Sequence, residues 1–110
     1  TSPYHSKEMF LCIGKTLRAA NYRALPYHEN VPSFGEWGWH LAWLHGVSEA
    51  RMKQKLDQLK PLTIPTSYLT ASLVATATAF AKSWLDDEHI EINTKFRPTI
   101  LQYHRRAWRN

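Results

Sequence analysis

The feature that most constrains this chain is a run of side chains with a strict period of two, directly after a Pro-Ser-Phe-Gly turn. The large members are Trp37, Trp39, Leu41 and Trp43, and those between them are Gly38, His40 and Ala42. Successive side chains of a β-strand point to opposite faces of a sheet, so this period predicts a strand over residues 36–44. Both faces carry apolar or small residues, which is typical of an inner strand covered on both sides.

A second strand is predicted upstream, over residues 22–27, and the turn at residues 32–35 joins the two as an antiparallel hairpin. Pro26 lies within this second strand. Because proline has no N–H group, it cannot donate to the ladder of a central strand. We therefore expect residues 22–27 to lie at the edge of the sheet.

The segment before the hairpin predicts an amphipathic helix over residues 6–20. Ser6 is a suitable N-cap, and the apolar stripe consists of Phe10, Ile13 and Leu17. Asn21 follows the helix and, after Gly, is the residue best suited to the left-handed conformation that ends a helix.

Two small residues inside this helix indicate how it packs. Gly14 lowers helix propensity, so we expect it to allow close packing against the sheet. Cys12 is the lone cysteine, and its helical context favours a buried apolar side chain over a nucleophile or a metal ligand.

Three further helices are predicted in the second half, over residues 48–59, 65–82 and 98–108. Ser48 caps the first of them, and Pro61 ends it. The last helix has an apolar stripe that should dock on the core, formed by Ile100, Leu101, Tyr103 and Trp108. Its basic residues should remain in solvent, namely Arg105, Arg106 and Arg109.

These elements predict an α/β protein, or α+β if the chain is considered by itself. Residues 1–46 would form a helix with an antiparallel strand pair, and residues 47–110 a helical extension. A chain of 110 residues is long enough for one modest core. It has no apolar run near the roughly 20 residues that span a bilayer.

Composition argues against several classes of function. The formal charge is +5, but the basic residues are scattered except near the carboxyl end, so nucleic-acid binding is disfavoured. The six His residues lack the spacings of metal ligands, as for His40 and His45, so no metal site is expected. The sequence has no Gly-rich phosphate loop and no nucleophile elbow. We therefore predict no catalytic residue in this chain.

Aromatic density leaves two interpretations open. Trp and Tyr rings attract cations and also bury methylene groups, so a groove lined by them suits a diamine with charged ends. The alternative is that Trp37, Trp39 and Trp43 are core residues on one face of a sheet, and composition alone favours this alternative.

The sequence Val-Pro-Ser-Phe-Gly-Glu-Trp-Gly at residues 31–38, with Ser-Pro-Tyr at 2–4 and Pro-Tyr-His at 26–28, resembles the spermidine synthases, especially the long bacterial polyamine aminopropyltransferases. The resemblance implies a C-terminal fragment of a Rossmann-like, methyltransferase-type fold. In that fold residues 22–27 would form the edge strand and residues 36–44 an inserted inner strand. The neighbour of that inner strand would end just before Thr1, so we expect a homo-oligomer formed through strand exchange.

The resemblance also implies a reaction: the transfer of an aminopropyl group from decarboxylated S-adenosylmethionine to putrescine by a cytoplasmic parent protein. A membrane tether upstream is the open alternative for localisation. The family's Asp-x-x-Asp-Pro loop and its cofactor residues are absent here, so this chain should bind no cofactor and be inactive alone. The residues implied at the diamine-side wall are Val31, Pro32, Glu36 and Trp37.

Two details qualify this wall. Val31 stands where shorter spermidine synthases carry a Tyr that packs on the diamine, and it offers neither a ring nor a hydroxyl group. Glu36 could attract the distal ammonium group, although a turn carboxylate is more often solvated. The rival function is a small basic interaction or oligomerisation module that binds nucleic acid or an acidic partner through residues 105–109.

Overall fold

The computed structural model describes residues 1–61 and 63–109 of the chain. In this part of the molecule four helices surround one antiparallel hairpin, in agreement with the predicted α/β or α+β class. The elements are α1 (Lys7–Ala19), β1 (Arg23–Val31), β2 (Gly35–Trp43), α2 (Glu49–Asp57), α3 (Ala71–Ala77) and α4 (Thr99–Ala107).

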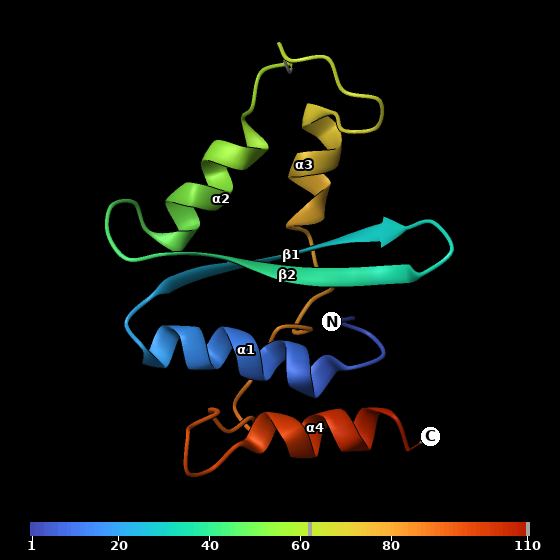
Figure 1. Ribbon diagram of the computed structural model, residues 1–110. Coiled ribbons are helices and arrows are strands. Elements are labelled where there is room, and N and C mark those ends of the chain that lie inside the picture. The colour runs from blue at the N-terminus through green and yellow to red at the C-terminus, as the bar shows by residue number, and fades with distance from the viewer. Residues whose placement is uncertain (62, 110) are drawn as a thin grey trace.

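The elements are stacked in layers (Figure 1). The hairpin lies across the middle, α1 packs on one face of it, and α4 packs on the far side of α1. Helices α2 and α3 pack on each other and on β1 from the opposite face. The predicted division into residues 1–46 and 47–110 stays a prediction, and residues 62 and 110 of the second part lie outside the described residues.

The hairpin is longer than predicted, because β1 continues to Val31 and pairs with β2 without interruption. Phe34 donates its N–H to the carbonyl of Val31 at 2.9 Å and so closes a four-residue turn. Pro32 is the second residue of this turn, and Ser33 is the third, with a φ of 72°. Proline followed by a positive φ is the arrangement of a type II turn. Gly35 begins β2 with a φ of 85°, which Gly adopts without strain.

Helix α1 sits close to β2 because the two elements carry small residues where they meet. A Cβ atom at Gly38 would lie 2.5 Å from the Phe10 ring, so glycine makes room for that ring on the strand. A Cβ atom at Gly14 would lie 2.7 Å from Cε1 of His40. The prediction that Gly14 allows close packing on the sheet is confirmed.

His40 links the strand to the helix. Its ring stacks on Phe10 with centroids 4.4 Å apart, and its Nε2–H donates to the carbonyl oxygen of Phe10 at 2.9 Å. The buried Nδ1 has no hydrogen-bond partner in the described part of the chain. Burial lowers the pKa of His40 below its usual value, the bond to Phe10 opposes this, and the charge of Arg18 lowers it further. His40 is therefore a neutral ring.

The opposite face of β2 is less covered than the sequence predicts. Trp37 is 39% exposed and Trp39 is 41% exposed, although Tyr27 stacks on the Trp39 ring at 5.4 Å. The prediction that β2 is covered on both faces therefore holds only for the face that packs against α1. The reason is that α2 and α3 contact mainly β1 and leave much of β2 open.

The buried core lies between α1 and α4, and it consists of Phe10, Leu11, Cys12, Ile90 and Tyr103. Cys12 is fully buried, as predicted. The prediction for the stripe of α4 is half wrong, because Leu101 and Trp108 are exposed while Tyr103 is buried and Ile100 packs against the core. One helix of nine residues can present only a narrow stripe to α1.

The helix predicted over residues 65–82 is wrong in length, since α3 has only seven residues. Hydroxyl groups account for the difference. The Thr70 side chain accepts from the N–H of Leu73 and starts the helix late, while the Thr78 hydroxyl bonds to the carbonyl of Ala75 at its end. Short polar side chains of this kind compete with helical hydrogen bonds. By contrast, Ser48 caps α2 as predicted.

None of the helices in residues 1–61 and 63–109 is both long enough and apolar enough to cross a lipid bilayer.

We expect Gly14→Ala to destabilise the protein by about 1–3 kcal/mol, because the new methyl group would overlap His40. The helix propensity of Ala alone would give a gain of about 1 kcal/mol instead. Urea denaturation of Gly14→Ala, His40→Ala and the double variant tests this. In the double variant the clash is absent, so the Ala at position 14 should stabilise. Stabilisation by Gly14→Ala alone would contradict the close contact.

We also expect a pH-dependent stability from His40. Since its pKa is lower in the folded state than in the unfolded state, the contribution of the neutral ring is complete above pH about 6.5 and is lost as the pH falls through the folded pKa. His40→Gln can still donate to Phe10 but does not titrate. Between pH 8 and pH 5, the denaturation midpoint should therefore fall less for the variant than for the wild type. Equal losses in both proteins would show that His40 does not carry this dependence.

Candidate functional site

The four residues predicted at the diamine-side wall lie at the turn end of the hairpin, but the structure brings only two of them into one groove. Glu36 and Trp37 line a groove of about 510 Å³ beside the start of β2. Val31 and Pro32 belong to the turn and do not line it. The groove is formed where the chain's first residues, α1, the hairpin and the end of α4 meet.

The sequence did not identify several residues that line this groove, of which those with aromatic rings are His5, Phe34, His104 and Trp108. Two of these come from α4 and its C-cap, which lie about 70 residues along the chain from the turn. Trp108 is 77% exposed, which is unusual for a residue of this size. Its position at the end of an amphipathic helix was the only signal in the sequence, and that signal predicted burial.

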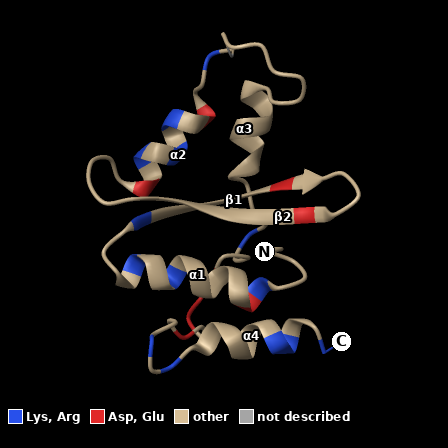
Figure 2. Ribbon diagram, in the orientation of Figure 1, with Lys and Arg blue, Asp and Glu red and all other residues tan. Residues whose placement is uncertain are grey.

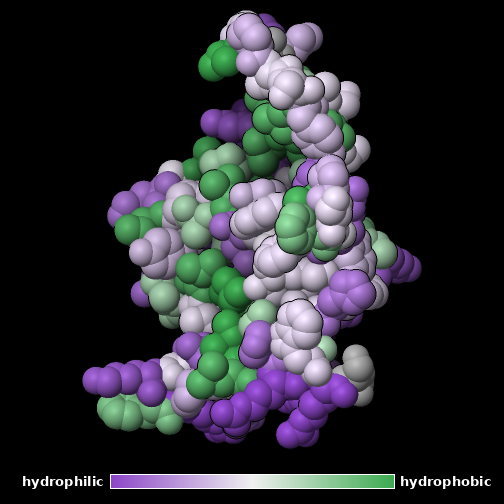
Figure 3. Space-filling view, turned by 45° about the vertical axis from the view of Figure 1, so that its right-hand side comes forward, coloured by the Kyte–Doolittle hydropathy of each residue, from purple (hydrophilic) through white to green (hydrophobic). Residues whose placement is uncertain are grey.

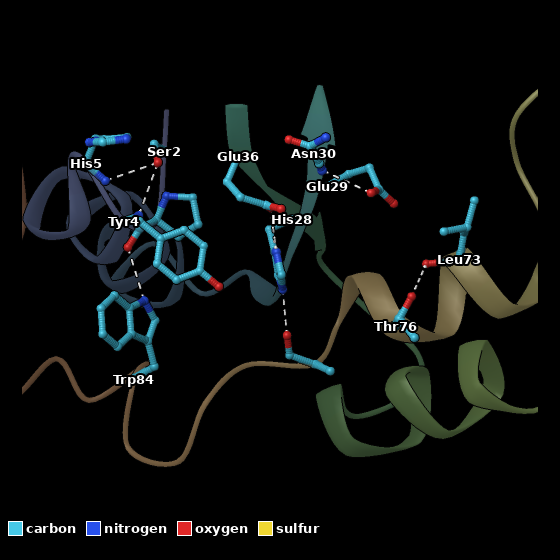
Figure 4. Close-up of polar contacts among 12 residues, drawn as sticks. Ser2, Tyr4, His5, His28, Glu29, Asn30, Glu36, Leu73, Thr76 and Trp84 are labelled. Carbon is cyan, nitrogen blue, oxygen red and sulfur yellow. Dashed lines mark hydrogen bonds and ion pairs between the residues drawn. The ribbon is translucent and has the colours of Figure 1, made fainter. Parts of the chain in front are cut away.

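Glu36 is the one carboxylate among the groove residues, and it is not simply solvated as a turn residue was expected to be. Its Oε2 lies 2.9 Å from Nδ1 of His28 on the neighbouring strand (Figure 4). On the other side of the ring, Nε2 of His28 lies 2.6 Å from the carbonyl oxygen of Ala79, just after α3. The turn is thus tied through His28 to the segment after α3.

The outer edge of β1 is closed to further strands. The N–H of Ala24 points away from β2 and donates to Glu49 at 3.1 Å, while the carbonyl of Ala24 accepts from Arg18. Burial tends to raise the pKa of Glu49, but the hydrogen bonds from Arg18 and Ala24 outweigh it and lower that pKa. Two residues further on, Pro26 has no N–H to offer. Both strands of a two-stranded sheet are edges, so the edge position expected for residues 22–27 stays a prediction, with which these contacts agree.

The outer edge of β2 is different. The N–H of Gly38 points away from β1 and donates to the carbonyl of Thr1 at 2.8 Å. Backbone direction alternates along a strand, so the N–H groups of His40 and Ala42 point the same way. No other backbone hydrogen bond reaches this edge within the described ranges. The chain's first residue thus lies against a strand edge that remains available for pairing.

Charge is unevenly distributed over the molecule (Figure 2). The turn end of the hairpin carries the acidic residues Glu29 and Glu36, while basic residues gather near α4. The basic cluster is partly neutralised, because Arg106 pairs with Glu8 at 3.3 Å. Figure 3 shows apolar residues across the middle of the molecule and a hydrophilic band at the end where α4 lies. The acidic turn is therefore the better candidate for a cationic ligand.

Within residues 1–61 and 63–109, no three His, Cys, Asp or Glu side chains lie close enough together to hold a metal ion.

Comparison with known proteins gives a consistent family. The chain is 40% identical over 109 residues to a polyamine aminopropyltransferase of Shewanella oneidensis. The aligned stretch covers 98% of this chain and 18% of that protein. Polyamine aminopropyltransferase 2 of Ralstonia nicotianae is 33% identical over 110 residues, and a polyamine aminopropyltransferase of Oceanobacillus iheyensis is 30% identical over 115. No family model matches the sequence, and no solved structure does.

These similarities extend over almost the whole chain but over only about a fifth of the relatives' own length. They confirm the resemblance that residues 31–38 suggested. Along nearly all of its length, the chain is therefore a homologue of the polyamine aminopropyltransferases.

Proposed function

We propose that this chain forms the diamine-side wall of an aminopropyltransferase and has no catalytic activity by itself. In the reaction, the amine of putrescine attacks the aminopropyl carbon next to the sulfonium of decarboxylated S-adenosylmethionine, and methylthioadenosine leaves. Residues outside this sequence would bind the aminopropyl donor and accept the proton of the amine. The observation that carries the proposal is the groove that holds Glu36 and Trp37 together, in a chain related to these enzymes.

The chemistry of the groove suits a diamine. The carboxylate of Glu36 offers a partner for one ammonium group, and the Trp37 ring offers a face that attracts a cation and covers methylene groups. Trp108 and Phe34 add further aromatic surface. An acidic turn in a chain of net charge +5 also concentrates cations at this end of the molecule.

We further propose that the hairpin completes a Rossmann-like sheet in which β1 is the edge strand and β2 an inner strand. The closed outer edge of β1 and the accessible outer edge of β2 support this order. The carbonyl of Thr1 already bonds to that accessible edge, which is where a preceding strand would lie. Without such a strand, the same edge can pair with a second copy of the chain.

The wall is tested in a chimera of the Shewanella oneidensis relative in which this chain replaces the matched stretch. Trp37→Ala should raise the KM for putrescine by about 2- to 30-fold, which corresponds to a cation–π contact of about 0.5–2 kcal/mol. Trp39→Ala is the matched control, because Trp39 is equally exposed on the same strand face but does not line the groove.

The KM for decarboxylated S-adenosylmethionine should not change in either variant. Equal effects of the two tryptophans on putrescine would contradict the proposed wall. Turnover by the 110-residue chain alone would contradict the proposal that it lacks a catalytic centre.

The accessible edge of β2 predicts dimers of the isolated chain by light scattering. Ala42→Pro removes an N–H that points away from β1, so this variant should be monomeric while it keeps its circular dichroism spectrum. Ala42→Ser keeps the N–H and should remain dimeric. A monomeric wild-type chain, or a dimer that survives the proline, would rule out association through this edge.

A further inference from the structure

The ring of His28 lies between two oxygen atoms, one from Glu36 and one from the backbone of Ala79. When Glu36 is ionised, both oxygens are hydrogen-bond acceptors and neither can donate. Nδ1 is 2.9 Å from Oε2 of Glu36, and Nε2 is 2.6 Å from the carbonyl oxygen of Ala79 (Figure 4). A neutral imidazole has one N–H and can donate to only one of them. The second contact would then bring two lone pairs together. Both contacts are favourable when the ring carries protons on both nitrogens.

The surroundings of the ring are suited to an imidazolium. The His28 side chain is 17% exposed, and the Phe80 ring lies 4.5 Å from it, within the range of a cation–π contact. From the N-terminal turn, the titratable Tyr4 meets it edge-on at 6.0 Å. Glu36 is the charged group that contacts the ring from the neighbouring strand.

We propose that His28, as an imidazolium, is a positioning residue that holds the Glu36 carboxylate at the groove for the ammonium group of the diamine. This inference rests on the proposed function. The bond to His28 uses Oε2 of Glu36, and Oε1 has no hydrogen-bond partner among the described residues, so it is free to accept from the ligand. The arrangement assigns a specific role to a residue outside the groove lining.

The opposing effect is charge neutralisation, because an imidazolium reduces the field of the carboxylate. We expect positioning to prevail. A Glu side chain on a surface turn loses rotamer freedom when it binds a ligand, and fixing it beforehand removes that cost. Attraction between exposed charges is weakened by solvent, whereas a correctly directed hydrogen bond to an ionised group is stronger than a neutral one.

The first test is spectroscopic and does not depend on the enzyme's activity. In the ¹⁵N-labelled 110-residue chain, the ring nitrogens of His28 should both have shifts of protonated nitrogens at pH 7. A neutral ring at pH 7, with one protonated nitrogen, would overturn the proposal.

The second test measures putrescine kinetics in the Shewanella oneidensis chimera. His28→Gln should raise the KM for putrescine by about three- to tenfold with kcat within about twofold, since loss of a positioning contact weakens binding of the diamine. A KM for putrescine that falls in His28→Gln would mean that neutralisation prevails, which contradicts the proposal.

Coupling separates positioning from a merely structural role. His28→Gln should have little effect on putrescine in a Glu36→Gln background, because no carboxylate remains to be held. His89→Gln, at an exposed position outside the groove, is the matched control and should leave the KM unchanged. If the double variant shows the product of the two single-variant increases in the KM for putrescine, His28 and Glu36 act independently and the proposal is wrong.

Failure of the wider function can be distinguished from failure of this inference. If Trp37→Ala and Trp39→Ala behave alike, the diamine wall is wrong whatever His28 does. If Trp37→Ala alone raises the KM but His28→Gln does not, the wall stands and the role of His28 is refuted. Should His28→Gln fail to fold, the ring shifts of the wild-type protein still decide the question.

Discussion

The close contact between α1 and β2 is the interaction on which the rest of the structure depends. Two glycines make it possible: Gly38 makes room on the strand for Phe10, and Gly14 makes room on the helix for His40. The resulting interlock fixes the height and rotation of α1 above the hairpin. Because α4 packs on the other side of α1, the same contact also sets where the end of α4 meets the turn. The groove is therefore a consequence of helix packing as much as of the turn itself.

The two edges of the hairpin have different roles. At β1, a proline and a carboxylate occupy the positions where another strand would bond, so this edge offers no N–H group for pairing at Ala24 and Pro26. At β2, the strand with the highest aromatic density keeps its outward N–H groups. A two-stranded sheet is marginal in water by itself, so the large side chains of this hairpin depend on the packing of the helices around it.

The sequence was sufficient for the elements whose signal is local. Period-two alternation predicted β2, and the helical stripe with Gly14 predicted α1 and its close packing. The eight residues of the turn were specific enough to identify the family.

Prediction failed where distant segments compete or meet. The extent of α3 was set by Thr70 and Thr78, whose hydroxyls bond to the backbone, and hydrophobic spacing does not report such bonds. The contact of His28 with Glu36 and Ala79 joins residues that are eight and 51 positions apart. Trp108 reaches the groove only because α4 folds back along α1. None of these relations leaves a periodic signal, so three-dimensional information was needed for half of the site.

The buried thiol of Cys12 can report how often the interior of the protein opens to solvent. The thiol is completely enclosed between α1 and the segment before α4, where it bonds to the carbonyl of Glu91 at 3.3 Å. An alkylating reagent can reach the sulfur only after these segments separate. The rate of modification would thus measure how often the interior is transiently exposed, without any label being introduced.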